Sequence, residues 1–499
     1  MTERIFKYLT KILDPESAKL ILKPYKLNIP LTIRTNTLKT QANELKSKLE
    51  NKGFKLLEID LVPDSFIVEE EPFPISKTVE HFAGLFYVQS LSSMLPSLIL
   101  EPKPNEIILD IASAPGSKTT HIAQLMKNTG IIIANDISFE RLKVVAHQID
   151  RLGILNTAIT SIDGNRFGAI LPEIFDKALV DAPCSALGII SKANEVLNWW
   201  SIDEVKRLSN KQQQLLISAI KSVKPGDIIV YSTCTLTVEE NEIVIDSILK
   251  KFPVEIEEIE YKKAEFDEGI TSYDGLPLDE RLKKAVRIYP FKANTEGFFI
   301  AKLRKTDSTF SKSPKITEIN NGKTIQQIKF LTANDEKLKS PLKFLSDEFG
   351  IEEKIWEEFA FYFKGDELWF SSLDWIKFLT TDFSLINKNF KHHLLSSLVQ
   401  RVGLKLAKAV KNKQWKISTS ALQLLAPFIT KNIIEFETEE QARTFLNGGT
   451  IKNFPSNFNP GSYIAVKFDG IILGCGLITK EGLKSQIPKG RRSSEVEVI

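Results

Sequence analysis

Six short runs of β-branched and other apolar residues constrain the fold of this chain more than any other feature. They lie between about residue 105 and residue 305, with helix-like stretches between them, and read EIILDIA, IIIAND, TAITSID, DKALVDA, DIIVYST and GFFIAKL. A strand that is apolar on both faces must be covered by helices on both sides, as in the parallel sheets of α/β proteins. The sequence therefore predicts an α/β, Rossmann-like domain over residues 96–305 with a doubly wound parallel sheet.

The rest of the chain is expected to form further units, because 499 residues are too many for one hydrophobic core. Residues 1–95 open with a helix-like stretch and continue with a strand, a helix and two strands, which indicates a small α/β unit. Polar, proline-interrupted sequence predicts a linker at 306–323, and an aromatic-bearing helical or mixed region follows at 324–412. Residues 413–499 include two alternating strands joined by Asp469-Gly470, a strong hairpin signal, and are expected to form a small β-rich module.

Composition limits the compartment and the partners. Three cysteines are too few for a disulfide framework or a zinc site, so we expect a reducing, cytoplasmic location and no metal. No window approaches the roughly 18 uninterrupted apolar residues of a membrane span, so no membrane association is expected. The net charge is only +3, but cations gather in clusters that are either solvated faces or a nucleic-acid footprint. These clusters are Lys302, Arg304 and Lys305; Lys405, Lys408, Lys411 and Lys413; and Lys489, Arg491 and Arg492.

The turn after the first apolar run has the composition of a ligand-binding loop. Small residues let the backbone approach a ligand closely, and the amides of the following helix can hold an anionic group. The loop lacks the glycines of G-x-G-x-x-G, which argues against a dinucleotide and a NAD-dependent dehydrogenase, and it does not match a P-loop. The alternative is a tight strand–helix turn without a ligand. The loop residues are Ala112, Ser113, Ala114, Pro115, Gly116, Ser117 and Lys118.

Two acids follow the next two runs. Asp136 ends the second run about 20 residues after the loop, where an acid is placed to bind the ribose hydroxyls of an adenosine. Asp163 ends the third run and is placed to reach the adenine amino group. Either acid alone is also a reasonable helix N-cap. Together with the loop, the two acids favour a cofactor that carries a nucleoside.

Two of the three cysteines stand just past the fourth and fifth runs. Cys184 lies in DAPCSALG, three residues after Asp181, and Cys234 lies in STCTL. If the two strands are neighbours, the thiols meet beside the cofactor, because the carboxyl ends of parallel strands face the ligand crevice. A lone cysteine is more often a packing residue, but this pair suits covalent catalysis. A thiolate adds to C6 of a pyrimidine, C5 attacks an electrophilic methyl group, and a base removes the C5 proton.

The order of these motifs resembles the RNA (cytosine-C5)-methyltransferases of the Sun/nucleolar-p120 type. The match covers roughly residues 30–305 and includes RTNTLK, YVQSLSS, APGSKTT, DAPCS, STCTLTVEENE and EGFFIAKLRK, in the family's order. The resemblance implies that S-adenosylmethionine (SAM) is the cofactor. By the same resemblance SAM is held by the loop 112–118, Asp136, Asp163 and Asp181.

The resemblance also implies the catalytic roles. Cys234 is expected to be the nucleophile, and Cys184 is expected to support elimination and product release. Asp181 is expected to touch the target base and the methyl end of the cofactor. Arg34 and Asn36, in IRTNTL, resemble the family's N-terminal RNA-side motif.

Two positions depart from the family's pattern. Ser117 stands where glycine is common, and Ala186 replaces the glycine that often follows DAPCS. Both side chains are small, so activity is expected to be retained. The APGSKTT loop and the long extension are most similar to the bacterial small-subunit ribosomal RNA methyltransferases within the family. The terminal module resembles their PUA-like RNA-binding region.

These observations predict a SAM-dependent enzyme that methylates C5 of a cytidine in RNA, with 16S rRNA or the small ribosomal subunit as the expected substrate. The N-terminal unit and the C-terminal extension are expected to bind RNA, so removing the extension should leave SAM binding intact. A tRNA (cytosine-C5)-methyltransferase and a non-catalytic ribosome-assembly factor are the alternatives. Ribose methylation would leave both loop cysteines unexplained.

Overall fold

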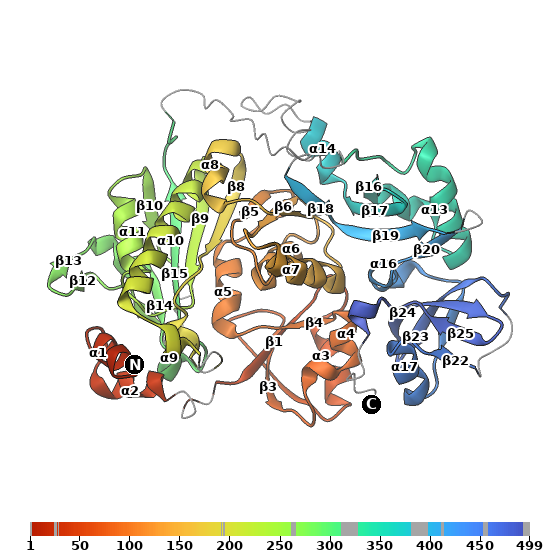
Figure 1. Ribbon diagram of the computed structural model, residues 1–499, viewed down its shortest axis with the longest axis horizontal. Coiled ribbons are helices and arrows are strands. Elements are labelled where there is room, and N and C mark those ends of the chain that lie inside the picture. The colour runs from red at the N-terminus through yellow and green to blue at the C-terminus, as the bar shows by residue number, and fades with distance from the viewer. Residues whose placement is uncertain are drawn as a thin grey trace.

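A central sheet with helices on both faces dominates the computed structural model of the chain, with smaller sheets packed against it (Figure 1). The structure describes residues 2–23, 27, 29–190, 192, 195–260, 266–310, 328–380, 398–410, 414–452 and 458–492. Most of the predicted linker therefore lies outside the described residues. Within this described part, no helix combines the length and apolar composition needed to cross a membrane.

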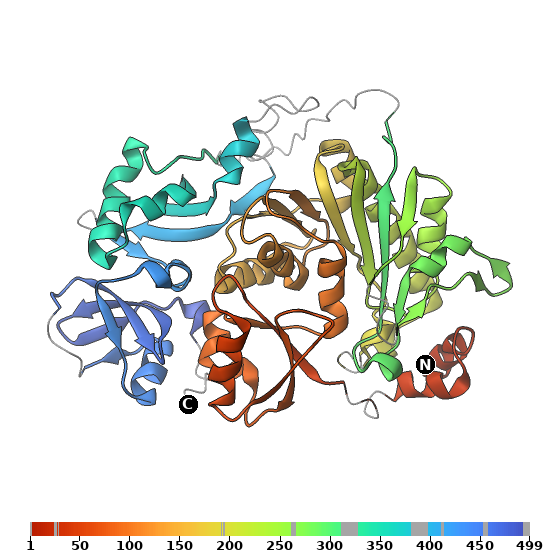
Figure 2. The same cartoon turned by 180° about the vertical axis from the view of Figure 1, so that it is seen from behind.

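The N-terminal segment forms two separate pieces. Helices α1 and α2 pack near α9, whereas the remaining elements form a small sheet in the order β2-β3-β1-β4 with α3 against it (Figures 1 and 2). The predicted order of strand, helix, strand and strand is confirmed, because Leu45 and Leu49 of α3 pack on Ile33 and Phe66 of the sheet. The elements are α1 (Thr2–Leu9), α2 (Pro15–Leu22), β1 (Leu31–Thr35), α3 (Ala42–Glu50), β2 (Lys55–Glu58), β3 (Ser65–Glu70), α4 (Val79–Ala83) and β4 (Phe86–Val88).

The central sheet contains the predicted parallel core in the order β9-β8-β5-β6-β7. Its strands are β5 (Ile107–Asp110), β6 (Ile131–Asn135), β7 (Thr157–Thr160), β8 (Phe175–Asp181) and β9 (Val223–Thr233). Helices α5 (Leu91–Ile99), α6 (Ser117–Leu125), α7 (Phe139–Leu152), α8 (Phe167–Ile170), α9 (Val196–Trp199), α10 (Ile202–Ser222), α11 (Glu242–Leu249) and α12 (Pro290–Ala293) accompany it. The chain reverses its direction of winding between β5 and β8, and such a switch point opens a crevice for a ligand.

The expectation of an all-parallel sheet is wrong at both edges. The sixth run, β15 (Phe298–Lys305), pairs antiparallel with β9, and β10 (Val254–Glu257), β14 (Val286–Ile288) and β11 (Asp267–Glu268) extend that edge. At the other edge β18 (Val399–Val402), from the C-terminal extension, pairs antiparallel with β7. An apolar run alone does not fix strand direction, because direction depends on the connection that precedes it. The hairpin of β12 (Ser272–Tyr273) and β13 (Leu276–Pro277) lies in the predicted insertion.

The C-terminal extension is built mostly on strands, and the described part of 324–412 is mixed, which is one of the two forms expected for it. The first sheet has the order β16-β17-β19-β20 and the terminal module has the order β21-β23-β24-β25-β22. The predicted hairpin is confirmed, since Asp469 and Gly470 both have positive φ between β23 and β24. The elements are α13 (Glu336–Phe349), β16 (Phe359–Lys364), β17 (Glu367–Ser372), α14 (Asp374–Thr380), β19 (Leu404–Ala409), β20 (Trp415–Ile417), α16 (Thr419–Leu424), β21 (Ile433–Glu435), α17 (Glu439–Leu446), β22 (Thr450–Ile451), β23 (Tyr463–Phe468), β24 (Ile471–Thr479) and β25 (Gly482–Ser485).

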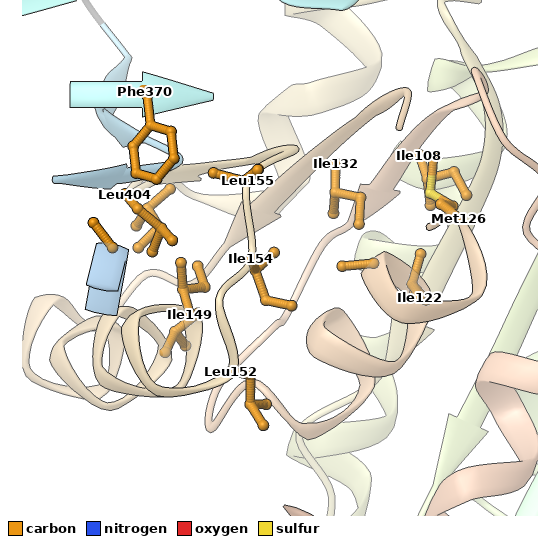
Figure 3. Close-up of a cluster of buried hydrophobic side chains, with 14 of the residues drawn as sticks. Ile108, Ile122, Met126, Ile132, Ile149, Leu152, Ile154, Leu155, Phe370 and Leu404 are labelled. Atoms are coloured by element: carbon orange, nitrogen blue, oxygen red, sulfur yellow. The ribbon is translucent and has the colours of Figure 1, made fainter. Parts of the chain in front are cut away.

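The extension shares a hydrophobic core with the central domain. Phe370 and Leu404 lie against Leu155 and Ile149 of the α7–β7 region (Figure 3). The ion pair between Arg401 and Asp150 adds a charged contact, with 2.6 Å between Nη2 and Oδ1. The central domain and the extension therefore pack as one hydrophobic unit through this core.

The last turn of α4 is a second place where separate parts of the chain meet. Its carbonyls at residues 81–83 accept hydrogen bonds from Lys39, from Arg151 of α7 and from Arg491 of the terminal module. The carbonyls at the end of a helix lack partners within the helix and carry partial negative charge. Three cations from three parts of the chain satisfy them, which ties these parts together.

Candidate active site

The two cysteines that follow β8 and β9 are in contact. The strands are parallel neighbours, with Asp181 opposite Ser232, and this register brings Cys184 and Cys234 to the same edge of the sheet. Their sulfur atoms are 3.3 Å apart, and both side chains are partly exposed. The hydrogen bond to Cys234 and burial raise the pKa of the Cys184 thiol well above its usual value. Cys184 is therefore a protonated partner beside Cys234.

A buried carboxylate holds the loop that carries Cys184. Glu240 accepts hydrogen bonds from the Ser185 amide at 2.9 Å, from the Ser185 hydroxyl, from Thr237 Oγ1 at 2.6 Å and from Gln212 Nε2 at 2.8 Å. Burial raises its pKa despite these hydrogen bonds. Sequence reasoning missed this role, because an acid-rich stretch after a strand looks like the exposed start of a helix.

Asp181 lies at the end of β8 and is held by two polar groups. Lys118 Nζ is 2.7 Å from Oδ2, and the Ser232 hydroxyl donates to Oδ1 at 2.8 Å. Lys118 is itself 6% exposed and lies over the ring of Phe298. Lys118 was predicted to bind the cofactor, but the structure places its ammonium on the Asp181 carboxylate. The sequence separates Lys118 from Asp181 by several elements, so their contact carried no local signal.

The predicted cofactor loop starts α6 at the switch point between β5 and β8. Gly116 adopts φ 102°, a region that favours glycine, whereas Ser117 begins the helix and needs no glycine. Ala186, the second departure, adopts φ 56°, which explains why glycine suits that position. Pro115 is exposed, and Ala112 is partly exposed.

Unsatisfied buried oxygen atoms gather around this loop. Among the described residues, Asp110 Oδ1 and Ser113 Oγ are buried without a hydrogen-bond partner, and Asp136 Oδ2 is buried with an ion pair to Arg141 but no hydrogen bond. All three belong to the ends of β5 and β6 or to the loop between β5 and α6. Native proteins rarely leave buried polar atoms unpaired, so the cluster indicates a polar ligand. A cofactor with hydroxyl and ammonium groups, such as SAM, fits these acceptors.

Asp136 occupies its predicted position and has a cationic neighbour. Its Oδ1 accepts the Ser138 amide at 2.8 Å, and Arg141 Nη1 lies 3.1 Å from Oδ2. Arg141 also donates to the Ala114 carbonyl at 2.7 Å, so it links the loop to the acid. Ile137, the next residue, is 68% exposed beside them.

Asp110 and Asp163 differ from the expectations. Asp110 was not predicted, yet burial raises its pKa to about 7 at the start of the cofactor loop. Asp163 is exposed, and its carboxylate caps a short helical turn by accepting the Asn165 amide at 3.1 Å. The N-cap alternative therefore describes the structure, and the adenine contact of Asp163 stays a prediction.

The suggestion that Arg34 and Asn36 face RNA is wrong, because both side chains are 2% exposed. Arg34 donates to Gln89, Gln124 and Thr120, of which the last two belong to α6. Asn36 donates to the Gly84 and Leu152 carbonyls at 2.8 Å. Both residues join the N-terminal sheet to the central domain. A short polar motif is easily mistaken for an exposed one.

The basic clusters are mostly neutralised within the chain. Ion pairs join Lys302 to Glu101, Arg304 to Glu257, Lys305 to Glu173, Lys405 to Glu367 and Lys408 to Asp366. Arg491 is held by side chains and a carbonyl, whereas Lys489 and Arg492 are exposed. Lys411 and Lys413 lie outside the described residues. The clusters at 302–305 and 405–408 therefore do not form a free nucleic-acid surface.

Comparison with known proteins identifies the family. Residues 97–304 match the family described as 16S rRNA methyltransferase RsmB/F, residues 2–91 match the N-terminal domain of 16S rRNA methyltransferase RsmF, and residues 431–493 match the methyltransferase RsmF PUA domain. The chain is 33% identical to the ribosomal RNA small subunit methyltransferase F of Aliivibrio salmonicida, over 92% of this chain and 90% of the relative. The chain belongs to the RsmF family of 16S rRNA methyltransferases.

Two further relatives agree with this assignment. The 28S rRNA (cytosine-C(5))-methyltransferase of Mus musculus is 43% identical over 281 residues, which are 55% of this chain and 35% of the relative. The crystal structure of NSun6 from Pyrococcus horikoshii with SFG is 28% identical, with a TM-score of 0.53 over 61% of this chain and 98% of that one. The predicted Rossmann-like fold, rRNA (cytosine-C5)-methyltransferase class, SAM cofactor and PUA domain are thereby confirmed at the level of the family.

Proposed function

We propose that the chain transfers the methyl group of SAM to C5 of a cytidine in 16S rRNA through a covalent adduct with Cys234. The observation that carries the proposal is the contact of the Cys184 and Cys234 sulfurs just past β8 and β9, beside Asp181 at the end of β8, whose carboxylate pairs with Lys118 of α6. The loop 112–118, Asp136 and Asp181 would hold SAM, which would supply an electrophilic methyl group. The unsatisfied oxygens at this loop support its binding. The RsmF relatives favour 16S rRNA over tRNA.

The positions of the side chains suggest their roles. Cys234 adds to C6 as the thiolate, and the ammonium of Lys118, held on the Asp181 carboxylate, is placed to donate a hydrogen bond at N3, where negative charge develops. C5 is then enamine-like and takes the methyl group. A base or water at the site takes the C5 proton, the electrons of that C–H bond form the C5–C6 double bond, and the C6–S bond breaks with its electron pair returning to sulfur. The Cys184 thiol, which its hydrogen bond and burial keep protonated, is placed to stabilise the departing Cys234 thiolate by donating a hydrogen bond to it.

Single and double cysteine variants test this assignment. Incubated with SAM and labelled 16S rRNA, Cys184→Ala should accumulate a covalent protein–RNA band on a denaturing gel, because attack proceeds and release fails. Cys234→Ala and the double variant should show no band, which places attack before elimination. A band that survives in Cys234→Ala but is absent in Cys184→Ala would reverse the two roles. Unchanged methylation in both variants would overturn the covalent mechanism.

The substrate is tested separately. Bisulfite sequencing of 16S rRNA and tRNA from cells with and without the gene should show one cytidine of 16S rRNA losing its modification. Loss confined to tRNA would support the tRNA alternative, and no loss anywhere would support the non-catalytic assembly factor. Methylation in vitro of naked 16S rRNA and of small ribosomal subunits would then show which form is the substrate.

A further inference from the structure

The N-terminal helix α1 packs against the segments that follow both cysteines. Ile5 and Leu9 of α1 are fully buried, and Tyr8 is 6% exposed. Figures 1 and 2 both show α1 beside α9 and apart from the small N-terminal sheet. The apolar cluster around α1 includes Leu187 and Ile190, which follow Cys184, Leu236 and Val238, which follow Cys234, and Trp200 after α9.

The hydroxyl group of Tyr8 is tied to the loop that carries Cys234. It accepts a hydrogen bond from the Val238 amide at 2.9 Å and donates one to the Glu239 carboxylate. Tyr273 donates to the other oxygen of Glu239 at 3.1 Å. The ring of Tyr8 packs edge-on against Trp200, with 5.3 Å between the ring centroids. Both the ring and the hydroxyl of Tyr8 are therefore fixed.

The contact with Tyr8 supplies the partner of the Val238 amide in a loop whose carbonyls have other donors. Asn241 Nδ2 donates to the Thr235 carbonyl, Arg287 Nη1 to the Leu236 carbonyl and the Ile243 amide to the Val238 carbonyl. Thr235 and Thr237 bind neighbouring hydroxyls and Glu240, which hold the side that faces Ser185. The Val238 amide is bound by the Tyr8 hydroxyl. A buried amide that loses its partner costs free energy and shifts to regain one. Removal of the Tyr8 hydroxyl should therefore displace the backbone four residues after the nucleophile.

We propose that Tyr8 is a positioning residue for Cys234, so that α1 belongs to the catalytic machinery of the enzyme rather than to its RNA-binding surface. This inference rests on the proposed role of Cys234. Tyr8 is buried behind the loop and cannot touch RNA or cofactor. Its loss should therefore slow the attack of Cys234 on C6 and leave the affinities for RNA and SAM unchanged.

The test compares Tyr8→Phe with Lys7→Ala in the Cys184→Ala background, where the covalent adduct accumulates. Lys7 is exposed on the same helix, so its variant controls for a general change in α1. At saturating SAM and 16S rRNA, Tyr8→Phe should slow adduct formation about fivefold to thirtyfold, the effect of leaving one buried amide unpaired. Lys7→Ala should match the background. The affinities for RNA and SAM, measured by filter binding and calorimetry, should stay within about twofold.

An unchanged rate of adduct formation in Tyr8→Phe would overturn the inference. If the rate of adduct formation falls only in proportion to the loss of SAM-binding sites, the inference is also overturned, because that pattern indicates that part of the protein is unfolded. If the Cys184→Ala background forms no adduct at all, the proposed function fails instead. In that case the rate at which iodoacetamide alkylates Cys234 without RNA tests the inference about Tyr8. Cys475 is buried, so in the Cys184→Ala background the measured alkylation reports Cys234. A change in Tyr8→Phe alone supports the inference, and equal rates refute it.

Discussion

Gly188 is the position where the smallest substitution should disturb the nucleophile most. It lies between two backbone segments: its amide donates to the Cys234 carbonyl at 3.0 Å, and its own carbonyl accepts from the Gly297 amide at 2.9 Å. A Cβ atom at Gly188 would lie 2.4 Å from the Gly297 carbonyl oxygen and 2.8 Å from the Cys234 carbonyl oxygen. Gly188 does not have a positive φ, so alanine is excluded by space and not by conformation.

The size of the disturbance follows from these distances. Relief of the shorter contact to 3.0 Å, the lower limit of real contacts, requires the backbone to move by about 0.6 Å. Overpacking of this kind costs about 1–3 kcal/mol of stability, and a misplacement approaching 1 Å at a reacting group costs on the order of 100-fold in rate. Gly188→Ala should therefore lower kcat by about 10- to 100-fold.

The assay is single-turnover methyl transfer to 16S rRNA, normalised to the number of SAM sites found by calorimetry. Gly490→Ala is the matched control, because an added Cβ there meets nothing within 4 Å. Gly188→Ala should keep SAM affinity within about twofold of the parent, because neither of the two hydrogen bonds of Gly188 involves the loop 112–118. A Gly188→Ala enzyme with the rate of the parent would show that contact between these backbones does not position Cys234.

Three further predictions concern the cofactor site and the extension. Asp136→Asn should weaken SAM binding about 10- to 150-fold by calorimetry, whereas Glu140→Gln, at an exposed position in the first turn of the following helix α7, should not; equal affinities would remove Asp136 from the site. Asp110, with a folded pKa of about 7, keeps a proton that the unfolded chain loses near pH 4, so stability falls as pH rises from about 4 to 7, by at most about 1.4 kcal/mol per pH unit. Urea unfolding of Asp110→Asn at pH 5, 6 and 7 should show a flatter dependence, and an identical slope would contradict the raised pKa. Ending the chain at residue 310 should expose the edge of β7 and the core near Leu155, so the fragment should melt lower and lose SAM binding; a stable fragment with full SAM affinity would refute this.

The last of these predictions reverses an expectation from the sequence. An extension that begins after a polar linker was expected to be separable from the cofactor domain. The structure instead inserts β18 next to β7 and packs Phe370 and Leu404 on the α7–β7 region. The run of residues that predicts a strand at β18 is short, and nothing in that run indicates which edge of which sheet the strand joins.

The sequence by itself determined the features that depend on neighbouring residues. The six apolar runs, the turn at Gly116 and the hairpin at Asp469-Gly470 follow from periodicity and backbone preference, which act within a few residues. The placement of Asp136, Cys184 and Cys234 at strand ends follows from the same local rules. Because parallel strands end at one edge, these rules were enough to predict that the functional groups gather there.

Only the tertiary structure decided which groups are in contact at that edge. Lys118 on Asp181, Glu240 under the Cys184 loop and Tyr8 under the Cys234 loop join segments that are distant in the sequence. Arginine is usually a surface residue, yet Arg34 is buried against α6. A polar side chain does not show whether its partner will be water or another part of the chain. That choice is made when packed surfaces exclude water, since each buried polar group must then find a partner across the interface.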